Sequence, residues 1–335
     1  MNNTLKSKRS FLSRACLTGV AVAMMAFGGL SMAAPKYSIK VAYENNPGEP
    51  LDLAAKDWAR VFKEKTKGEG ELQLFPSSAL GSKKDVMEQM KLGSGVITIT
   101  DGGFLADYVP DFGILMGPYL ANDYKDLFKL VKSPWFAEVS TKLSAKGLHI
   151  LTSNWLYGTR HFLLKKPAKT PAELKGVKLR SPNNRIQIEA IQSMGATPTP
   201  MPLSEVYPAL SSGVIDGTES PISVFYAMKA FEAAKYLVKT GYIHNISQWV
   251  AGEKYFAKLP PEIQKALTES ADVAGNFMTN SVMAAEKDAV EKLKAAGVTI
   301  IEVDKEAFRK AAMPTYSKFP EWTPGLYDKV QGYMK

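Results

Sequence analysis

The hydrophobic pattern opens with two units in which a strand is followed by a helix. An alternating stretch at 37–43 predicts a strand, and 51–66 carries its apolar side chains on one helical stripe with lysine and glutamate opposite. A strand at 71–75 and a helix beginning at Ser82 repeat this order, and Asp85 three residues on resembles a capping box. Repeated strand-helix units predict a parallel-rich sheet covered by helices.

Further along the chain, short predicted strands alternate with loops and helices. The strand at 96–100 leads directly into Asp101, and open α/β sheets place their ligands at the carboxyl ends of strands. Strands predicted at 148–155 and 161–164 indicate that the chain crosses there into a second lobe. Later elements are a strand at 177–180 and helices at 186–194 and 204–212, and each helix ends at a glycine.

The longest element that the pattern predicts is a helix at 261–297. Its apolar residues keep a helical period from the proline at its start to the glycine at its end. At about 1.5 Å per residue such a helix spans roughly 55 Å, nearly twice the diameter of a small domain. A helix of this length can pack against both lobes.

The first 33 residues have the pattern of a secretory signal. Four basic residues precede an uncharged apolar run at 15–30, and Ser31 and Ala33 occupy the −3 and −1 positions of a cleavage site. The run is shorter than the roughly 20 residues that a membrane span needs, which disfavours a retained anchor. We therefore expect export to the periplasm and cleavage after Ala33.

Charge and size narrow the class of protein further. The formal net charge is +9, and losing the four basic residues before position 34 lowers it to 9 − 4 = +5. The remaining basic residues alternate with Glu and Asp along predicted helices, so no nucleic-acid surface is expected. The chain is 45% hydrophobic, and the roughly 300 residues that follow the signal exceed what one core organises. Two lobes are the expected result.

Few residues of the chain could carry catalysis. The only cysteine, Cys16, lies in the signal segment, so the exported chain is expected to hold neither a disulfide nor a thiolate metal site. His149, His161 and His244 lack metal-ligand spacing, and the chain has no nucleophile-elbow, Walker or dinucleotide-binding motif. We therefore expect no metal, no cofactor and no enzymatic activity.

Two arginines carry the positive signal. Arg160 and Arg180 end or follow predicted strands among small residues, whereas arginine on an amphipathic helix is usually surface charge. A guanidinium in this setting can hold a carboxylate through two parallel hydrogen bonds. The alternative is a pair of structural ion pairs with Asp or Glu, and the chemistry of the residues alone does not choose between the two.

Five segments resemble those of the TRAP-transporter solute receptors, the DctP family, and occur in the family's order. They are LFPSSALG (74–81), GPYL (117–120), GVKLRSPN (176–183), GATPTPMPLSEVY (195–207) and GVIDGTE (213–219). The resemblance covers essentially the whole exported chain. It implies a two-lobe α/β periplasmic-binding-protein fold, type II-like, that closes on its ligand as a Venus flytrap. The expected lobes are 34–157 plus 246–285 and 158–245 plus 286–335, with the long helix spanning both.

The resemblance also implies roles for individual residues. It places Arg180 where the family's arginine forms a salt bridge with the ligand carboxylate, and Arg160 where a second arginine faces the ligand. Glu219, in the Asp-Gly-x-Glu motif, is expected among the ligand-binding residues. The family usually has asparagine after this motif, whereas this chain has Ser220, which has a shorter reach and one fewer donor.

The other side of the site is expected to be acidic. Glu44, after the first strand, and Asp101 map to the mouth of the other lobe in this family, where carboxylates would accept hydroxyl or ammonium protons. Further candidates for aromatic walls and polar contacts are Phe104, Trp155, Tyr157, Tyr226, Tyr242, Trp249, Asn245 and Ser247.

The sequence therefore predicts a monomeric periplasmic receptor that binds a small organic anion between two lobes. The expected ligand is a sugar, hydroxy or keto acid, and the expected partners are the small and large membrane subunits of a TRAP transporter. An amino-bearing acid or a small phosphate ester stays open as the ligand. The alternative function is a periplasmic enzyme or sensor that acts on an anionic small molecule.

Overall fold

The computed structural model describes residues 34–335, so the predicted signal segment lies outside the described residues. The strands are β1 (Tyr37–Ala42), β2 (Gly70–Phe75), β3 (Val96–Thr100), β4 (Leu148–Leu164), β5 (Lys178–Ser181), β6 (Thr197–Pro200), β7 (Gly217–Pro221), β8 (Tyr236–Gly252) and β9 (Thr299–Ile301). The α-helices are α1 (Pro50–Lys65), α2 (Lys83–Lys91), α3 (Gly102–Leu105), α4 (Tyr124–Leu130), α5 (Pro134–Ala145), α6 (Arg185–Ser193), α7 (Val206–Ser212), α8 (Ile222–Ala227), α9 (Glu253–Phe256), α10 (Pro261–Ala295), α11 (Lys305–Ala312) and α12 (Leu326–Met334). Short 3-10 turns are η1 (Pro110–Met116), η2 (Pro171–Leu174), η3 (Leu203–Glu205), η4 (Ala230–Glu232) and η5 (Met313–Lys318).

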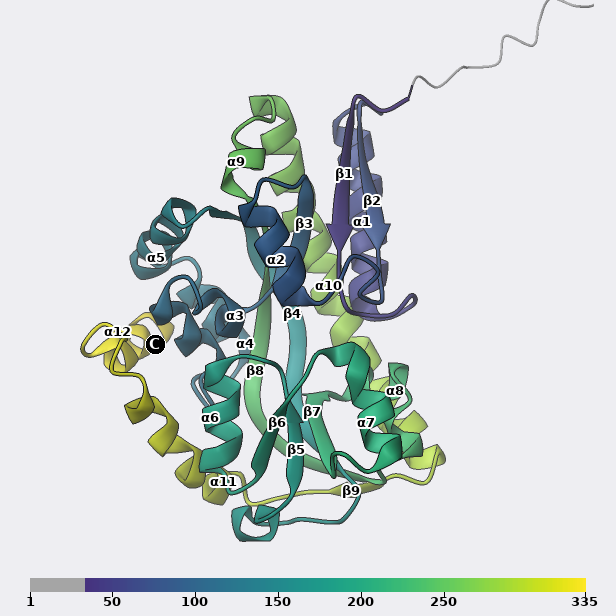
Figure 1. Cartoon of the computed structure of the whole chain (residues 1–335), viewed down its shortest axis with the longest axis vertical. Coiled ribbons are helices and arrows are strands. Elements are labelled where there is room, and N and C mark those ends of the chain that lie inside the picture. The colour runs from purple at the N-terminus through teal and green to yellow at the C-terminus, as the bar shows by residue number, and fades with distance from the viewer. Residues whose placement is uncertain (1–33) are drawn as a thin grey trace, which may run out of the picture. The chain divides into compact units, whose positions relative to one another are not determined.

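One mixed sheet joins all the strands, in the order β2-β1-β3-β8-β4-β7-β5-β6, with β9 beside β8. The short strands pair mainly in parallel, as β1 does with β2 and β3, and β5 with β6 and β7. The long strands β4 and β8 pair with each other antiparallel over their 17 residues. Both run from the half of the sheet with β1–β3 to the half with β5–β7 (Figure 1). The two predicted α/β lobes therefore share a continuous pair of strands.

The predicted division of 148–155 and 161–164 into two strands is wrong, because these residues form the single strand β4. The register between β4 and β8 shifts repeatedly, and one of these shifts lies between Leu156 and Gly158. Gly158 has φ +130°, which glycine adopts without steric cost. Gly158, which lies between the two predicted strands, thus stands at a bulge inside one strand.

Helices α1 and α10 cover one face of the first half of the sheet, where three tryptophans meet. Trp58 lies 5.0 Å from Trp249 and 6.1 Å from Trp155 between ring centroids. The Trp58 indole donates to the main-chain oxygen of Leu267 and to Ser270, both on α10. This cluster attaches the first half of α10 to the sheet.

The long helix predicted at 261–297 is confirmed as α10, with 35 residues. Its first part packs in the larger hydrophobic core, whereas Ala289 and Leu293 belong to a second core with residues of α7, α8 and β8. Figure 1 shows α10 passing along both halves of the sheet. The helix therefore braces both lobes, as its length predicted.

Local signals place the shorter helices. Ser82 accepts a hydrogen bond from the backbone N–H of Asp85, and the Asp85 carboxylate accepts one from the backbone N–H of Ser82, so the predicted capping box at the start of α2 is confirmed. Helix α7 ends at Gly213, whose φ of +82° gives the left-handed C-cap that the sequence indicated. The fold is thus specified by local as well as periodic signals.

The C-terminal segment, in which no element was predicted and which was expected to belong to the second lobe, also contacts the first. Helix α12 packs against α4, and Gln331 donates to the main-chain oxygen of Leu120. On the other side, Glu189 of α6 pairs with Lys318 at 2.8 Å. The last helices therefore bridge the first expected lobe and α6 of the second.

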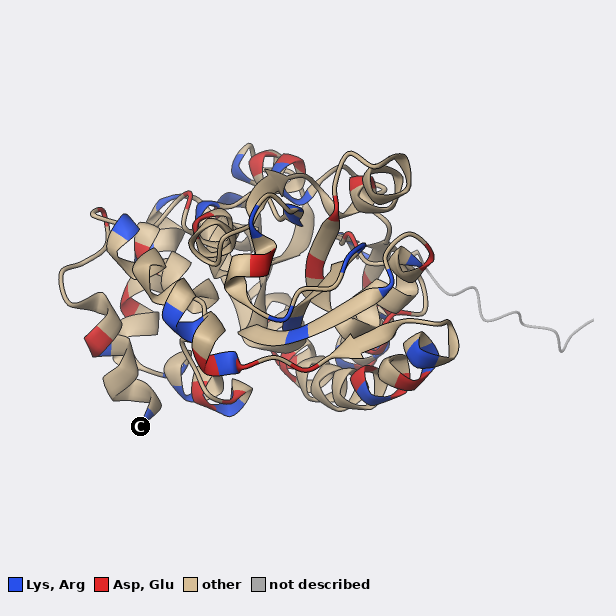
Figure 2. Ribbon diagram, turned by 90° about the horizontal axis from the view of Figure 1, so that it is seen from below, with Lys and Arg blue, Asp and Glu red and all other residues tan. Residues whose placement is uncertain are grey.

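Surface charges of both signs are interspersed along the helices (Figure 2). In α1, for example, Arg60 pairs with Asp57 and Glu64, and in α10 Lys292 pairs with Asp288. Exposed pairs of this kind contribute little to stability. Among residues 34–335, no helix combines the length and apolar character that a membrane crossing requires.

Candidate functional site

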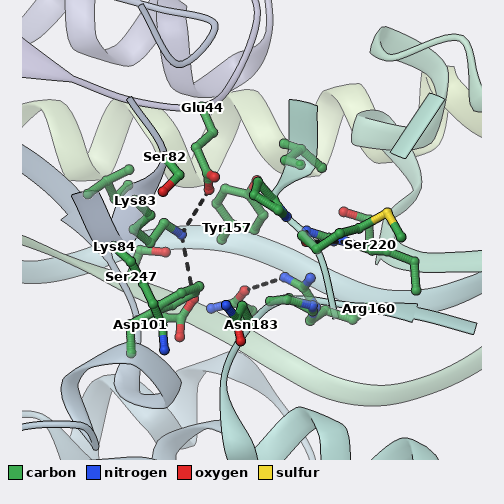
Figure 3. A pocket seen from close by; sticks show the side chains of 18 residues that line it. Glu44, Ser82, Lys83, Lys84, Asp101, Tyr157, Arg160, Asn183, Ser220 and Ser247 are labelled. Carbon is green, nitrogen blue, oxygen red and sulfur yellow. Dashed lines mark hydrogen bonds and ion pairs between the residues drawn. The ribbon is translucent and has the colours of Figure 1, made fainter. Parts of the chain in front are cut away.

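A cavity lies where the carboxyl ends of β1 and β3 face the strands β5 and β7 and the loop after β6 (Figure 3). The space inside it, with the open mouth included, is about 660 Å³. Nine of the fourteen residues that the sequence predicted at the site line it, namely Glu44, Asp101, Phe104, Tyr157, Arg160, Arg180, Ser220, Asn245 and Ser247.

Arg180, on β5, presents a buried guanidinium to this cavity. Only 3% of the residue is exposed. Its Nε and Nη2 both donate to the main-chain oxygen of Met201, at 3.0 and 2.8 Å. The nearest carboxylate oxygen, on Glu219, lies 3.7 Å from Nη1, beyond hydrogen-bond distance. Burial lowers the pKa of Arg180, because the charge of Glu219 only partly compensates for the loss of water.

Arg160, on β4, is held differently. Its Nε and Nη2 donate to the two carboxylate oxygens of Glu219, each at 2.6 Å, and its Nη1 donates to Asn245 at 2.8 Å. Although burial works in the opposite direction, the Glu219 charge raises the pKa of Arg160, and the two arginines lower that of Glu219. Tyr242 adds a hydrogen bond to Glu219 at 2.6 Å. Arg160 therefore has its counter-ion within the protein, and Arg180 has little of one.

Three charged groups from the other half of the sheet face these arginines. Lys83, the first residue of α2, places Nζ 3.5 Å from Glu44 and 3.9 Å from Asp101. The same Nζ lies 4.7 Å from the ring centroid of Phe104. Figure 3 shows Lys83 between the two carboxylates. Asp101 also caps α3 by accepting a hydrogen bond from the N–H of Gly103 at 2.9 Å.

Five of the sequence-predicted residues do not line the cavity: Trp155, Glu219, Tyr226, Tyr242 and Trp249. Trp155 packs with Trp249 in the core and donates to the main-chain oxygen of Ala271. Glu219 and Tyr242 lie behind the arginines and are fully buried. Glu219 therefore holds Arg160, and Tyr242 holds Glu219, which is a different role from the direct ligand contact that was expected.

Polar side chains complete the cavity wall between the two arginines and the facing charged residues of the other half of the sheet. Ser220 ends up on β7 beside His161 of β4 and is 1% exposed. The ring of Tyr157 lies 5.9 Å from the guanidinium carbon of Arg160, and its hydroxyl bonds with Asn45. Asn245 donates to the main-chain oxygen of Ile246, which fixes the amide oxygen that Arg160 contacts.

Sequence reasoning missed several lining residues: Ser82, Lys83, Lys84, Ile99, Pro182, Asn183, Met201, Pro202 and Leu203. Lys83 is the charged one that lies closest to the acidic pair. Its signal in the sequence is weak, because a lysine that follows an N-cap serine resembles ordinary surface charge. Lys83 comes close to Glu44, at the end of the first strand, only in the folded chain.

The chemistry of the described residues gives no sign of a metal centre. Among residues 34–335, no group of three or more His, Cys, Asp or Glu side chains is placed to hold a metal ion. His149, His161 and His244 all lie outside the cavity lining. The arrangement is instead suited to hold an anion at one end and hydrogen-bonding groups at the other.

Comparison with known proteins agrees with this geometry. Residues 41–321 match the family model of DctP, bacterial extracellular solute-binding protein, family 7. The 2,3-diketo-L-gulonate-binding periplasmic protein YiaO of Escherichia coli K12 is 33% identical over 290 residues, which are 86% of this chain and 88% of YiaO.

Solved structures extend the match to the fold. A TRAP periplasmic solute-binding protein from Ochrobacterium anthropi with bound L-fuconate is 51% identical, with a TM-score of 0.88 over 89% of this chain and 99% of that one. A second, from Actinobacillus succinogenes 130Z with bound L-galactonate, is 44% identical, with a TM-score of 0.87 over the same shares. The cavity between two lobes, the match over most of the chain and the shared fold lead to one conclusion: this chain belongs to the DctP family of extracellular solute-binding proteins, the solute receptors of TRAP transporters.

Proposed function

We propose that this receptor binds a monocarboxylic sugar acid, with the carboxylate on Arg180. The observation that carries the proposal is the guanidinium of Arg180, which is 3% exposed, faces the cavity and has no carboxylate within hydrogen-bond distance among the described residues. A buried charge that Glu219 only partly compensates is costly, and a ligand carboxylate would supply the missing counter-charge. The fork of a guanidinium also matches the two oxygens of a carboxylate.

The relatives support the choice of a sugar acid. YiaO is named for 2,3-diketo-L-gulonate, and the two solved structures carry L-fuconate and L-galactonate. Each of these ligands joins one carboxylate to a chain with several oxygen substituents.

Binding is proposed to close the two lobes over the ligand. At the mouth, α3 from one side meets the start of α6 from the other, and a β-carbon on Gly103 would lie 2.7 Å from Asn184. The boundary residues 157/158 and 245/246 are the proposed hinge, because β4 and β8 cross between the halves there. Hinge closure of this kind is a known way for two-domain receptors to enclose a ligand.

The proposed cellular role is delivery of the acid to the small and large membrane subunits of a TRAP transporter. The chain is proposed to act in the periplasm as a monomer, after cleavage of its signal at Ala33, and to leave its ligand chemically unchanged. A periplasmic enzyme or a sensor is the competing function. The lining contains carboxylates and arginines but no histidine.

Calorimetry and mass spectrometry test this function together. The exported protein is purified and titrated with L-galactonate, L-fuconate and a set of other organic acids. We expect one site per chain, and a melting temperature that rises with ligand, because a ligand at 100 times its dissociation constant adds about 2.7 kcal/mol of stability. Denaturation should then release the acid with unchanged mass. Release of a converted product would indicate an enzyme, and failure of every carboxylate to bind would contradict the proposed ligand class.

Three further measurements separate the finer parts of the proposal. Amino-terminal sequencing of protein secreted by a bacterial host should begin at Ala34. Sedimentation should give the mass of one chain. Uptake into vesicles that contain the two membrane subunits should require this protein and an ion gradient. Uptake that is independent of the protein would leave a sensor as the better description.

A further inference from the structure

Glu44, Lys83 and Asp101 form a charged cluster on the wall opposite the arginines. Their side chains are 14, 15 and 7% exposed, so all three are largely removed from water. They come from three separate elements: the end of β1, the first turn of α2 and the N-cap of α3. The fold therefore brings them together at one end of the cavity (Figure 3).

The cluster is incompletely hydrogen-bonded. Among the described residues, no hydrogen bond reaches the Lys83 ammonium or the Glu44 carboxylate, and the carboxylate of Asp101 accepts one, from Gly103. The Lys83 distances of 3.5 and 3.9 Å are ion-pair distances longer than normal hydrogen bonds. Polar groups that are buried in this way are normally satisfied by a partner. Both donors and acceptors stand free toward the cavity.

The two ends of the cavity have opposite formal charge. At one end Arg160 and Arg180 face Glu219, which leaves one positive charge. At the other end Lys83 faces two carboxylates, which leaves one negative charge. The neighbouring Lys84, whose ammonium lies 3.0 Å from Asp107, does not change this balance. A ligand with one carboxylate is attracted to the first end, and a second carboxylate would be repelled at the other.

We propose that Glu44, Lys83 and Asp101 form a subsite that reads hydroxyl groups at the end of the ligand farthest from its carboxylate. This rests on the proposed function, because the carboxylate on Arg180 fixes the ligand's direction. A hydroxyl group can donate to a carboxylate and accept from an ammonium at the same time. Two neighbouring hydroxyls of one ligand can therefore each accept a hydrogen bond from Lys83, while one donates to Glu44 and the other to Asp101.

Other terminal groups fit the cluster less well. An ammonium group on the ligand would meet the two carboxylates but also the positive charge of Lys83 between them. A methyl end would leave three buried charged groups without partners, which is costly. The subsite therefore selects polyhydroxy monocarboxylates over dicarboxylates, amino acids and plain fatty acids.

Three six-carbon acids test the proposal directly. L-galactonate has one carboxylate and a hydroxyl-bearing chain, galactarate replaces its terminal alcohol with a second carboxylate, and hexanoate lacks hydroxyls. Calorimetry on the wild-type protein should show galactarate and hexanoate binding at least about thirtyfold more weakly than L-galactonate, as expected for one or two lost charge-assisted hydrogen bonds.

Two variants assign the selectivity to the cluster. Glu44→Gln removes one negative charge, so the ratio by which L-galactonate binds more tightly than galactarate should fall by about tenfold. Lys83→Met keeps the aliphatic stem over Phe104 but removes the ammonium. It should lower the affinity for L-galactonate by about ten- to a hundredfold and bring that affinity closer to the affinity for hexanoate. Lys91→Met is the matched control, because Lys91 lies on the same helix, outside the cavity, beside Glu88. Asp101 is left intact because it caps α3.

The possible results separate this subsite from the proposed function. Equal affinity for the three acids, or gaps that neither Glu44→Gln nor Lys83→Met changes, would overturn the subsite and leave the anion site standing. Tighter binding of galactarate than L-galactonate would overturn it as well. Binding of none of the three acids would contradict the proposed function and, with it, the ligand class of the subsite.

Discussion

Arg180 donates two hydrogen bonds, from Nε and Nη2, to one main-chain oxygen, that of Met201. This contact fixes the plane of the guanidinium and leaves Nη1 and the outer hydrogen of Nη2 without a hydrogen-bond partner among the described residues. Because a lysine has a single nitrogen, it cannot keep the Met201 contact and present a fork to a carboxylate at once. The main-chain carbonyl of Met201 thus positions the Arg180 guanidinium in the proposed anion site.

We expect Arg180→Lys and Arg180→Ala to weaken binding of the carboxylate ligand strongly. Removing one partner of a buried charge pair costs about 2 to 5 kcal/mol, which corresponds to an affinity loss of roughly thirtyfold to several thousandfold. Calorimetry with L-galactonate measures the loss. Arg185→Ala is the control, because Arg185 is half exposed and pairs with Glu321. Wild-type affinity for Arg180→Ala would contradict the proposed binding mode.

A second prediction concerns the pair that stands behind the anion site. Arg160→Met leaves the fully buried Glu219 without its two-point partner, and breaking a buried pair from one side costs about 3 to 5 kcal/mol. Glu219→Gln leaves two neighbouring arginines with no negative charge between them. We expect the double variant to be more stable than the sum of the single losses by about 2 kcal/mol. Urea denaturation of the four proteins without ligand measures the coupling, and strictly additive losses would show that the pair does not act as a unit.

A third prediction addresses the serine that departs from the family's pattern. Ser220 lines the cavity beside Arg160 but offers one short hydroxyl. Ser220→Ala should therefore cost less affinity than either arginine variant, at about 1 kcal/mol for a single hydrogen bond. Ser220→Asn adds a donor while filling space, so it should tighten binding or shift preference to smaller acids. Calorimetry with L-galactonate and glycolate measures both effects. An unchanged ligand profile for Ser220→Asn would show that position 220 does not contact the ligand.

Periodic patterns predicted the elements that bury one face. The strand at 37–43 and the helix that became α10 follow clear periods of two and 3.6 residues. Strand β8 was not predicted, because nearly all of its second half is buried on both faces and no alternation results. The bulges of β4 have the same consequence, since each shift moves side chains to the other face.

Some residues of the candidate site were predicted from the sequence, and others were not. The resemblance brought Arg160, Arg180 and Ser220 to the cavity because the family's motifs fix them by position. Trp155 was placed in the cavity wall, but a register shift between Thr152 and Trp155 decides which way its ring points, and the sequence does not show that shift. Lys83 was overlooked because its partners lie far away along the chain. Contacts between distant segments are therefore what the sequence alone did not provide.

A fourth prediction tests closure of the lobes. A β-carbon at Gly103 would come within 2.8 Å of three atoms of the Asn184 side chain, which is itself held by Gln187 at the start of α6. Gly103→Ala should therefore hinder the approach of α3 to α6 and weaken ligand binding by about tenfold or more. The unliganded protein should keep its melting temperature, because the two elements can separate.

The control for this variant is Gly332→Ala, since a β-carbon on Gly332 meets nothing within 4 Å. Alanine in the helix α12 should stabilise the protein by up to about 1 kcal/mol and leave affinity unchanged. Small-angle scattering with and without L-galactonate reports the closure itself. Wild-type affinity and full compaction in Gly103→Ala would exclude this contact as part of the closed state.

The last prediction concerns the pH dependence of stability at His161, on β4 beside the site. Burial, with smaller effects from Lys239 and Lys305, lowers the pKa of His161 from 6.5 to about 3. The backbone N–H of Gly241 donates to its Nδ1 at 2.9 Å, and protonation of that nitrogen would break this bond. The folded chain therefore keeps His161 neutral at pH values where the unfolded chain binds a proton.

The sign of the effect follows from this difference. Because the folded pKa is depressed, the stabilisation is complete above the unfolded value of 6.5 and is lost as the pH falls toward 3. The loss is about 1.4 kcal/mol per pH unit, or roughly 2 kcal/mol by pH 5. His161→Asn, whose amide oxygen can still accept from Gly241, should be less stable at pH 7 and should lose less stability between pH 7 and pH 5. Urea denaturation at a series of pH values gives both slopes. Parallel curves for the two proteins would show that His161 is protonated as readily in the folded chain as in the unfolded one.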